Sequence, residues 1–201
     1  MAAAGTNPER ARWNRRYAEE ARSPEIPDSF FIDAYQEYVE PLLGARQGAL
    51  ALDVAAGAGR QGLWLAERAW NVTLVDISSE ALSLARRRAA GRNLSIEFLE
   101  CDLTTVRSAQ SQDWQGRFDL VLGFFYLHRD LFPVLVDALK PGGLLIYKTY
   151  TRLQLSFGTG PANPEHLLHP GELRTAFSAL TPLSYRETVR DRGVAELVAQ
   201  K

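Results

Sequence analysis

The feature that most limits how this chain can fold is a glycine-rich turn between an apolar run and a helical run, at residues 49–62. The apolar run ALALDV leads into Gly57-x-Gly59-x-x-Gly62, which has the spacing of a dinucleotide-binding turn. Glycines there permit positive φ angles and allow a ligand to approach the backbone closely. The sequence therefore predicts a nucleotide-like ligand at this turn, with a simple tight turn as the alternative.

Short apolar runs alternate with helical patterns on both sides of this turn. The expected strands are 49–54, 71–76, 95–102, 117–125, 144–151, 183–191 and 194–201, and the expected helices are 29–41, 60–68, 79–90, 130–139 and 170–180. Such alternation is typical of parallel strands joined by right-handed crossovers. The last two strands flank a turn at Arg192-Gly193, so they should pair antiparallel. The prediction is an α/β, doubly wound, Rossmann-like fold with a mostly parallel seven-stranded sheet and an antiparallel C-terminal hairpin strand.

The length of 201 residues suits a single domain, residues 1–201. We divide it into an N-terminal helical cap (1–45), a ligand-binding core (49–150), a lid loop (151–169), and a C-terminal helix and hairpin (170–201). The segment 151–169 is rich in Gly and Pro, and loops of this length in compact domains usually bind or cover a ligand. We therefore expect it to border the binding site.

The composition limits the possible binding partners and the cellular compartment of the protein. A net charge of −1 gives no field that would gather nucleic acid or anionic lipid. No run approaches ~18 apolar residues, and the N-terminal residues lack the apolar core of a signal peptide. A single cysteine excludes an intrachain disulfide, and three histidines show no metal-ligand spacing. We expect a cytoplasmic monomer or homodimer that binds a small molecule, without metal, nucleic acid or membrane.

Two acidic residues discriminate between possible ligands of the turn. Asp76 ends the second strand, 19 positions beyond Gly57, where a carboxylate can accept hydrogen bonds from ribose hydroxyls. This suits both NAD and S-adenosylmethionine. Asp53 lies four residues before Gly57, where its charge would repel a diphosphate but attract a sulfonium or an ammonium group. The alternative is that Asp53 only bonds backbone in the turn, and Gly62 then belongs to helix packing.

The segment DVAAGAGR resembles the first motif of the class I S-adenosylmethionine-dependent methyltransferases, and residues 49–150 carry the resemblance most strongly. The closing VAELVAQK is similar to the antiparallel strand that separates that fold from the NAD-binding one. The resemblance implies S-adenosylmethionine as cofactor. It implies the following cofactor-binding residues: Asp53, Ala55, Gly57, Gly59, Asp76, Ile77, Cys101, Asp102, Leu103, Gly123 and Phe124. Ala55 is a departure, because the family usually has glycine there.

A narrower set of motifs, WNRRY, PDSF and GPANPEHLLHPGEL, resembles the tellurite-resistance-type and thiopurine-type small-molecule methyltransferases. This implies a small-molecule acceptor, which could be a soft nucleophile such as a thiol, selenium or tellurium species. A soft anion would need no general base, whereas a hydroxyl or an amine would. An NAD-dependent oxidoreductase and a non-catalytic cofactor-binding protein remain the alternatives.

Candidates for the acceptor site follow the fourth strand or lie in flanking segments. His128 is the candidate base, with capping or packing against the next helix as its alternative. Phe125 could line the acceptor site, or be a core residue. Cys101 is expected to be a packing residue rather than a nucleophile. The candidate substrate-binding residues are Trp13, Arg16, Tyr17, Tyr126, Arg129 and Arg152.

Overall fold

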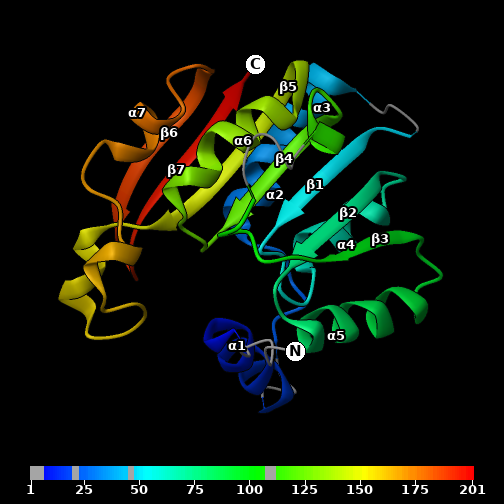
Figure 1. Cartoon of the computed structure of the whole chain (residues 1–201). Helices are drawn as coiled ribbons and strands as arrows, with labels where there is room; N and C mark the ends of the chain where they lie inside the picture. Colours follow the sequence, from blue (N-terminus) through cyan, green and yellow to red (C-terminus); the bar gives the residue numbers. More distant parts are fainter. Residues whose placement is uncertain (1–6, 20–22, 45–47, 107–111) are drawn as a thin grey trace.

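The computed structural model describes residues 7–19, 23–44, 48–106 and 112–201 of the chain (Figure 1). Residues 1–6, 20–22 and 45 of the predicted N-terminal cap lie outside these ranges. The described part holds a seven-stranded sheet in the order β3-β2-β1-β4-β5-β7-β6. Its strands are β1 (Leu50–Val54), β2 (Asn71–Asp76), β3 (Ile96–Glu100), β4 (Phe118–Phe124), β5 (Leu139–Tyr150), β6 (Thr181–Val189) and β7 (Gly193–Gln200).

The first five strands run parallel, and β7 is inserted antiparallel between β5 and β6. The register places Val54 of β1 beside Gly123 of β4, so the carboxyl ends of the central strands meet at one edge. This confirms the predicted fold, including the antiparallel hairpin. The apolar runs predicted it because strands buried on both faces carry continuous apolar side chains.

Helices cover both faces of the sheet. One face packs against α2 (Ser29–Ala34), α4 (Arg60–Ala66) and α5 (Ser79–Ala90), and the other against α6 (Phe132–Ala138) and α7 (Glu172–Ala176). Ser78 caps α5, because its Oγ accepts a hydrogen bond from the Ala81 N–H. Two separate apolar clusters, one on each face, hold these layers together.

The helix predicted over 29–41 is interrupted. After α2 the chain forms a π-helical turn, Tyr35–Val39, and then α3 (Glu40–Leu43). Pro41 stands in the first turn of α3 and has no N–H to donate to an upstream carbonyl. The Glu40 N–H accordingly bonds the Tyr35 carbonyl five residues earlier. The helix expected over 29–41 is therefore interrupted in its middle.

The strand expected over 144–151 is longer, because β5 begins at Leu139 and includes the segment LKPGG. The pairing with β4 jumps from Phe118↔Leu139 to Leu120↔Leu144, so the intervening residues form a bulge. The predicted lid loop contains two short 3₁₀ segments, η4 (Arg152–Phe157) and η5 (Pro164–His166), and α7 is shorter than the helix expected over 170–180. Figure 1 shows α1 (Pro8–Glu19) and the yellow segment after β5 at the edge where the parallel strands end.

Candidate active site

The turn after β1 has the left-handed backbone that the sequence predicted. Gly57 and Gly59 have φ angles of 57° and 74°, and Ala55 has a φ of 51°. Alanine therefore occupies a conformation that usually favours glycine. Ala55, at the first position of the motif, thus keeps the left-handed backbone conformation despite its methyl side chain.

Asp76 ties this turn to the end of β2. Its Oδ2 accepts a hydrogen bond of 2.7 Å from the Gly57 N–H, and its Oδ1 accepts one of 2.8 Å from the Ser78 N–H. Burial raises the pKa of Asp76, and these backbone donors oppose the rise. Each carboxylate oxygen can accept a second hydrogen bond. Asp76 thus lies at the predicted place, with remaining capacity to accept hydroxyl donors.

Asp53 lies beneath the turn. Its side chain is 2% exposed, and Oδ2 accepts a hydrogen bond of 3.2 Å from the Gly62 N–H in the first turn of α4. Burial raises its pKa to about 7, with Arg60 lowering it and Asp76 raising it further. The backbone contact named as the alternative is therefore present. The Asp53 carboxyl group still lies beneath the turn. The contact with the Gly62 N–H and an interaction with a cationic ligand are therefore compatible.

Gly62 is a packing position. A Cβ atom built on Gly62 would lie 2.2 Å from Leu74 Cδ2 and 3.1 Å from Val72 Cγ1. No side chain fits between α4 and β2 there. Gly62 of the GxGxxG motif is therefore required by the contact between helix and strand, as expected if Gly62 belongs to helix packing.

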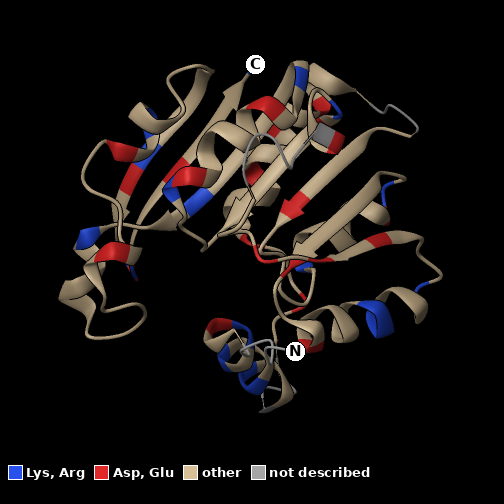
Figure 2. Cartoon of the chain, viewed as in Figure 1, with Lys and Arg blue, Asp and Glu red and all other residues tan. Residues whose placement is uncertain are grey.

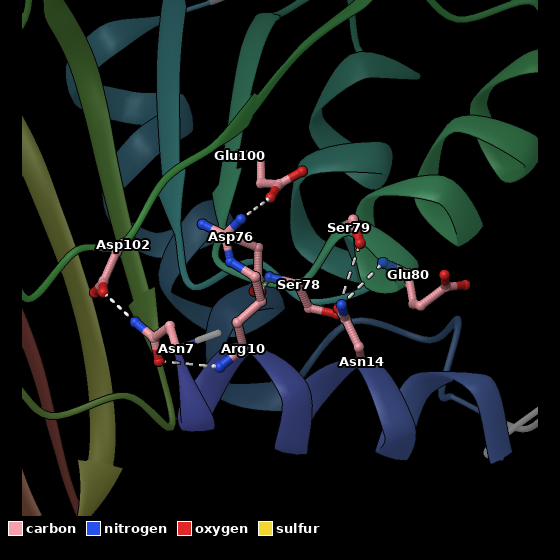
Figure 3. Close-up of polar contacts among 9 residues, drawn as sticks. All are labelled: Asn7, Arg10, Asn14, Asp76, Ser78, Ser79, Glu80, Glu100 and Asp102. Carbon is pink, nitrogen blue, oxygen red and sulfur yellow. Dashed lines mark hydrogen bonds and ion pairs between the residues drawn. The ribbon is translucent and has the colours of Figure 1, made fainter. Parts of the chain in front are cut away.

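Helix α1 lies against the ends of β2 and β3, held by polar contacts from two of its residues and from Asn7, which directly precedes it (Figure 3). Asn7 Nδ2 donates to Asp102 Oδ2 at 2.5 Å, and the Arg10 guanidinium pairs with Glu100 at 2.7 Å. Asn14 Oδ1 accepts a hydrogen bond of 2.8 Å from the hydroxyl of Ser78. The helix is thus attached to the ends of β2 and β3, at the predicted ribose and adenine positions. Figure 2 shows acidic positions at these strand ends opposite the basic residues of α1.

Three predicted substrate residues on α1 lie together. A Cβ atom built on Gly57 would lie 2.1 Å from the Tyr17 hydroxyl, so Tyr17 covers the glycine turn. The Trp13 ring lies 6.3 Å from the Tyr17 ring, with the Arg16 guanidinium 5.3 Å from the Trp13 centroid. The structure therefore places Tyr17 over the glycine turn, with Trp13 and Arg16 beside it on the same helix.

The segment after β3 lies beside the end of β2. The Cys101 N–H donates to the Asp76 carbonyl at 2.9 Å, and Leu103 is buried. Burial raises the pKa of the half-buried Cys101 thiol, which disfavours the nucleophilic thiolate. Asp102 Oδ1 accepts from the Thr104 N–H at 3.0 Å. Ile77 follows Asp76 and is half-buried, so the predicted residues of this side do come together.

The end of β4 is shaped by packing. A Cβ atom on Gly123 would lie 2.3 Å from the Tyr147 ring, so glycine is required for this close contact. Phe124 is buried in the core, where its ring lies 6.1 Å from that of Phe31. Both were predicted as cofactor-binding residues. The structure assigns the Phe124 side chain to the core, so any contact with a cofactor would come from its main chain.

Tyr126 and His128 follow β4. The Tyr147 hydroxyl donates to the Tyr126 carbonyl at 2.7 Å. Burial raises the pKa of the Tyr126 phenol, and the nearby carboxylates of Asp102 and Asp76 raise it further. The Nε2 atom of His128 is buried without a hydrogen-bond partner among the described residues, and its ring does not cap the following turn. The capping part of the alternative is therefore wrong, whereas the burial of Nε2 agrees with packing, and the role of His128 as a base stays a prediction.

Arg129 links the segment 151–169 to α7. Its Nε donates to Glu172 Oε1 at 2.5 Å, and its Nη2 to Glu172 Oε2 at 3.1 Å. Nη1 and Nη2 also donate to the carbonyls of Glu165 and Leu167. The guanidinium thus holds the lid segment, and its predicted contact with substrate stays a prediction. Arg152 is exposed at the start of η4, and its N–H donates to the Leu168 carbonyl.

Sequence reasoning missed a charged cluster beside the end of β4. Lys148 of β5 is 8% exposed, and its Nζ lies 2.8 Å from Asp28 Oδ1 and 3.0 Å from Glu196 Oε1. Arg186 also pairs with Glu196, and Arg60 lies 3.9 Å from Asp28. The available signal was a lysine inside the apolar strand LLIYKTY, because a buried lysine requires a partner.

A surface hollow of 490 Å³ lies elsewhere. It is bordered by Phe30, Asp33, Glu37, Tyr38, Ser184 and Arg186. These residues come from α2, the π-helical turn after it and the edge strand β6, and none of them belongs to the glycine turn. Within the described ranges we find neither a group of metal-ligating side chains nor a helix long and apolar enough to cross a membrane.

Comparison with known proteins identifies this architecture. Residues 51–143 match the family model described as a methyltransferase domain. A ubiquinone biosynthesis O-methyltransferase from Alkalilimnicola ehrlichii is 30% identical over 137 residues, which cover 66% of this chain and 54% of that protein. TehB from Haemophilus influenzae superposes with a TM-score of 0.69 at 15% identity, covering 94% of this chain and 67% of TehB. A SAM-dependent methyltransferase from Methanosarcina mazei gives 0.64 at 19% identity, covering 82% and 97%.

The two structural matches show the fold alone, because their identities are low. The chain spans about half the length of the curated relatives it matches. Residues 51–143 are thus similar to a methyltransferase domain, and the chain has the fold of the matched methyltransferase structures.

Proposed function

We propose that this chain, whose residues 51–143 match a methyltransferase domain, transfers a methyl group from S-adenosylmethionine to a small molecule. The observation that carries the proposal is the pair of buried carboxylates, Asp53 and Asp76, on either side of the glycine turn. Acidic groups so placed disfavour a diphosphate and favour a cationic ligand. The structure fits the group, because Asp76 can accept two further hydrogen bonds, as ribose hydroxyls require.

Each part of the chain then has a distinct task. Asp76 orients the ribose, and the segment Cys101–Leu103 contacts the base. Tyr17 closes the turn from above, and the contacts of α1 with Asp102, Glu100 and Ser78 hold that cover in place. When bound, the cofactor supplies an electrophilic methyl group with a good leaving group. The protein mainly has to align the acceptor for an in-line attack.

The acceptor side is formed by residues that follow β4 and β5. His128 is the proposed base for a hydroxyl or amine acceptor, because its buried Nε2 atom has no partner within the described ranges. Tyr126 borders the same space, and the segment 151–169, tied down by Arg129, lies next to it as the proposed lid. A soft nucleophile, including a thiol, selenium or tellurium species, would need only the alignment. The near-neutral charge of the chain supports a small-molecule partner over a nucleic acid.

Calorimetric titration tests the donor assignment. S-adenosylmethionine and S-adenosylhomocysteine should both bind in the micromolar range, and Asp76→Ala should weaken binding by on the order of 100-fold, because it removes charge-assisted hydrogen bonds. Asp137→Ala is the matched control, because Asp137 is an exposed carboxylate of α6. This variant should bind both ligands normally. Thermal stabilisation by NADH but not by S-adenosylhomocysteine would instead favour the oxidoreductase alternative.

A broad acceptor panel then tests catalysis. Thiols, selenite, tellurite and small phenols should include at least one molecule that becomes methylated. Binding of S-adenosylhomocysteine together with failure across the panel would support the non-catalytic alternative.

A further inference from the structure

The Phe125 ring occupies an unusual position at the end of β4. Its φ angle is 58°, a left-handed backbone that aromatic residues rarely adopt. The Phe125 N–H donates to the Lys148 carbonyl at 2.7 Å, which holds the ring at this edge of the sheet. The ring is half-buried and lies 5.1 Å from the ring of Tyr150. Strained backbone of this kind concentrates at binding sites.

Cationic groups from three separate elements surround this ring. The Arg192 guanidinium, in the turn between β6 and β7, lies 5.5 Å from the ring centroid. Lys148 Nζ lies at 5.6 Å and the Arg60 guanidinium at 5.8 Å. The sequence separates these residues widely, so only the folded sheet edge brings them together.

Carboxylates neutralise only some of these positive charges. Lys148 lies between Asp28 and Glu196, so its charge is neutralised. Those same two carboxylates are shared with Arg60 and Arg186. Within the described residues Arg192 has no carboxylate within ion-pair distance. Four cations therefore face two carboxylates, and the excess positive charge lies beside Phe125.

This excess lies next to the place where the donor methyl group would be presented. Arg60 directly follows the glycine turn, and Phe125 lies two residues beyond Gly123, which pairs with Val54 at the end of β1. We propose that Phe125 and Arg192 form an anion-binding subsite of the acceptor pocket, and that the methyl acceptor carries an oxyanion such as a carboxylate. The inference rests on the proposed function, because it specifies the substrate class of the same site.

Binding of benzoate and benzamide, which have similar shape but different charge, tests the proposal. Both are titrated calorimetrically into the full chain saturated with S-adenosylhomocysteine. Benzoate should bind about 10-fold more tightly than benzamide, and the preference should decrease in high salt. Arg192→Gln should remove most of this preference while leaving the affinity for S-adenosylhomocysteine unchanged.

Arg190→Gln is the matched control. Arg190 lies two residues earlier in the same exposed turn, whereas it is Arg192 that lies over the Phe125 ring. It should keep the preference for benzoate. Phe125→Leu is a second variant and should weaken benzoate binding without altering cofactor binding. Equal binding of the two probes, no binding of benzoate, or equal losses in both arginine variants would overturn the proposal. Failure to bind S-adenosylhomocysteine would instead contradict the proposed function.

Discussion

The two halves of the carboxyl edge of the sheet are built in opposite ways. At the ends of β1, β2 and β3, acidic side chains meet backbone donors from a glycine turn, and α1 covers them. At the ends of β4 and β5, an aromatic ring and basic side chains come from distant segments. The first half suits a cation, and the second suits an anion. One edge can therefore hold a positively charged donor and a negatively charged acceptor without mixing them.

The largest expected effect concerns the acidic half. Asp53→Asn should weaken S-adenosylmethionine binding by on the order of 10- to 100-fold, because it removes a buried charge near a cationic ligand. With a pKa of about 7 in the folded chain, Asp53 should also make wild-type affinity decrease as the pH falls below 7. Calorimetry between pH 6 and 8 measures this, and the variant should lose the dependence. An unchanged affinity in the variant would show that Asp53 acts only through the Gly62 backbone.

The same substitution should increase stability. Burial raises the pKa of Asp53 from 3.8 to about 7, so the folded state favours the protonated form. Its contribution to stability is complete below pH 4 and is lost as the pH rises through 7. At pH 8 the Asn variant should therefore be more stable than wild type, by up to about 4 kcal/mol. Denaturant unfolding at pH 4 and pH 8 provides the comparison, and the difference should shrink at pH 4.

Gly123 lies at the boundary between the two halves, and substitutions there should change packing. Gly123→Ala should destabilise the fold by about 1–3 kcal/mol, because the new methyl group would collide with the Tyr147 ring. Tyr147→Leu makes room, so adding Gly123→Ala to that variant should cost much less. The coupling free energy from denaturant unfolding of all four proteins is the measurement. Additive losses would mean that another contact makes glycine necessary here.

A smaller effect is expected for the attachment of α1. The Arg10–Glu100 pair is well exposed, at 43% and 38% of the side chains, so it should contribute no more than about 1 kcal/mol. Arg10→Ala should increase the dissociation rate of S-adenosylhomocysteine by about 2- to 5-fold, and high salt should remove the difference. Arg12→Ala is the control, because Arg12 pairs with Glu9 inside the same helix. A similar increase in that control would assign the effect to helix stability.

The two halves also differ in how far the sequence predicts them. The donor half depends on local spacing, so the strand, the glycine turn and Asp76 could be placed from neighbouring residues. The acceptor half depends on strand register. Lys148 meets Glu196 only because β7 enters the sheet beside β5, and Arg192 reaches Phe125 only through the hairpin.

Single residues after β4 were ambiguous for a related reason. A basic residue such as Arg129 can bind a ligand or a loop, and only the folded position of Glu172 shows what holds its guanidinium. The same holds for Pro41, whose effect on the helix depends on whether the chain can shift to a π turn.

The smallest effect is expected at Ala55, where the sequence departs from the family. A left-handed alanine costs about 1–2 kcal/mol, whereas glycine costs about 0.5–1 kcal/mol through unfolded-state entropy. Ala55→Gly should therefore change stability by less than about 1 kcal/mol, in the stabilising direction, and the affinity for S-adenosylmethionine by less than about 3-fold. Thermal unfolding and calorimetry of the two proteins measure both. An affinity gain much larger than this would mean that the Ala55 methyl group obstructs the donor half, and that the turn has been adapted away from tight cofactor binding. A small change would show that the backbone shape, which alanine already adopts here, is what the donor requires.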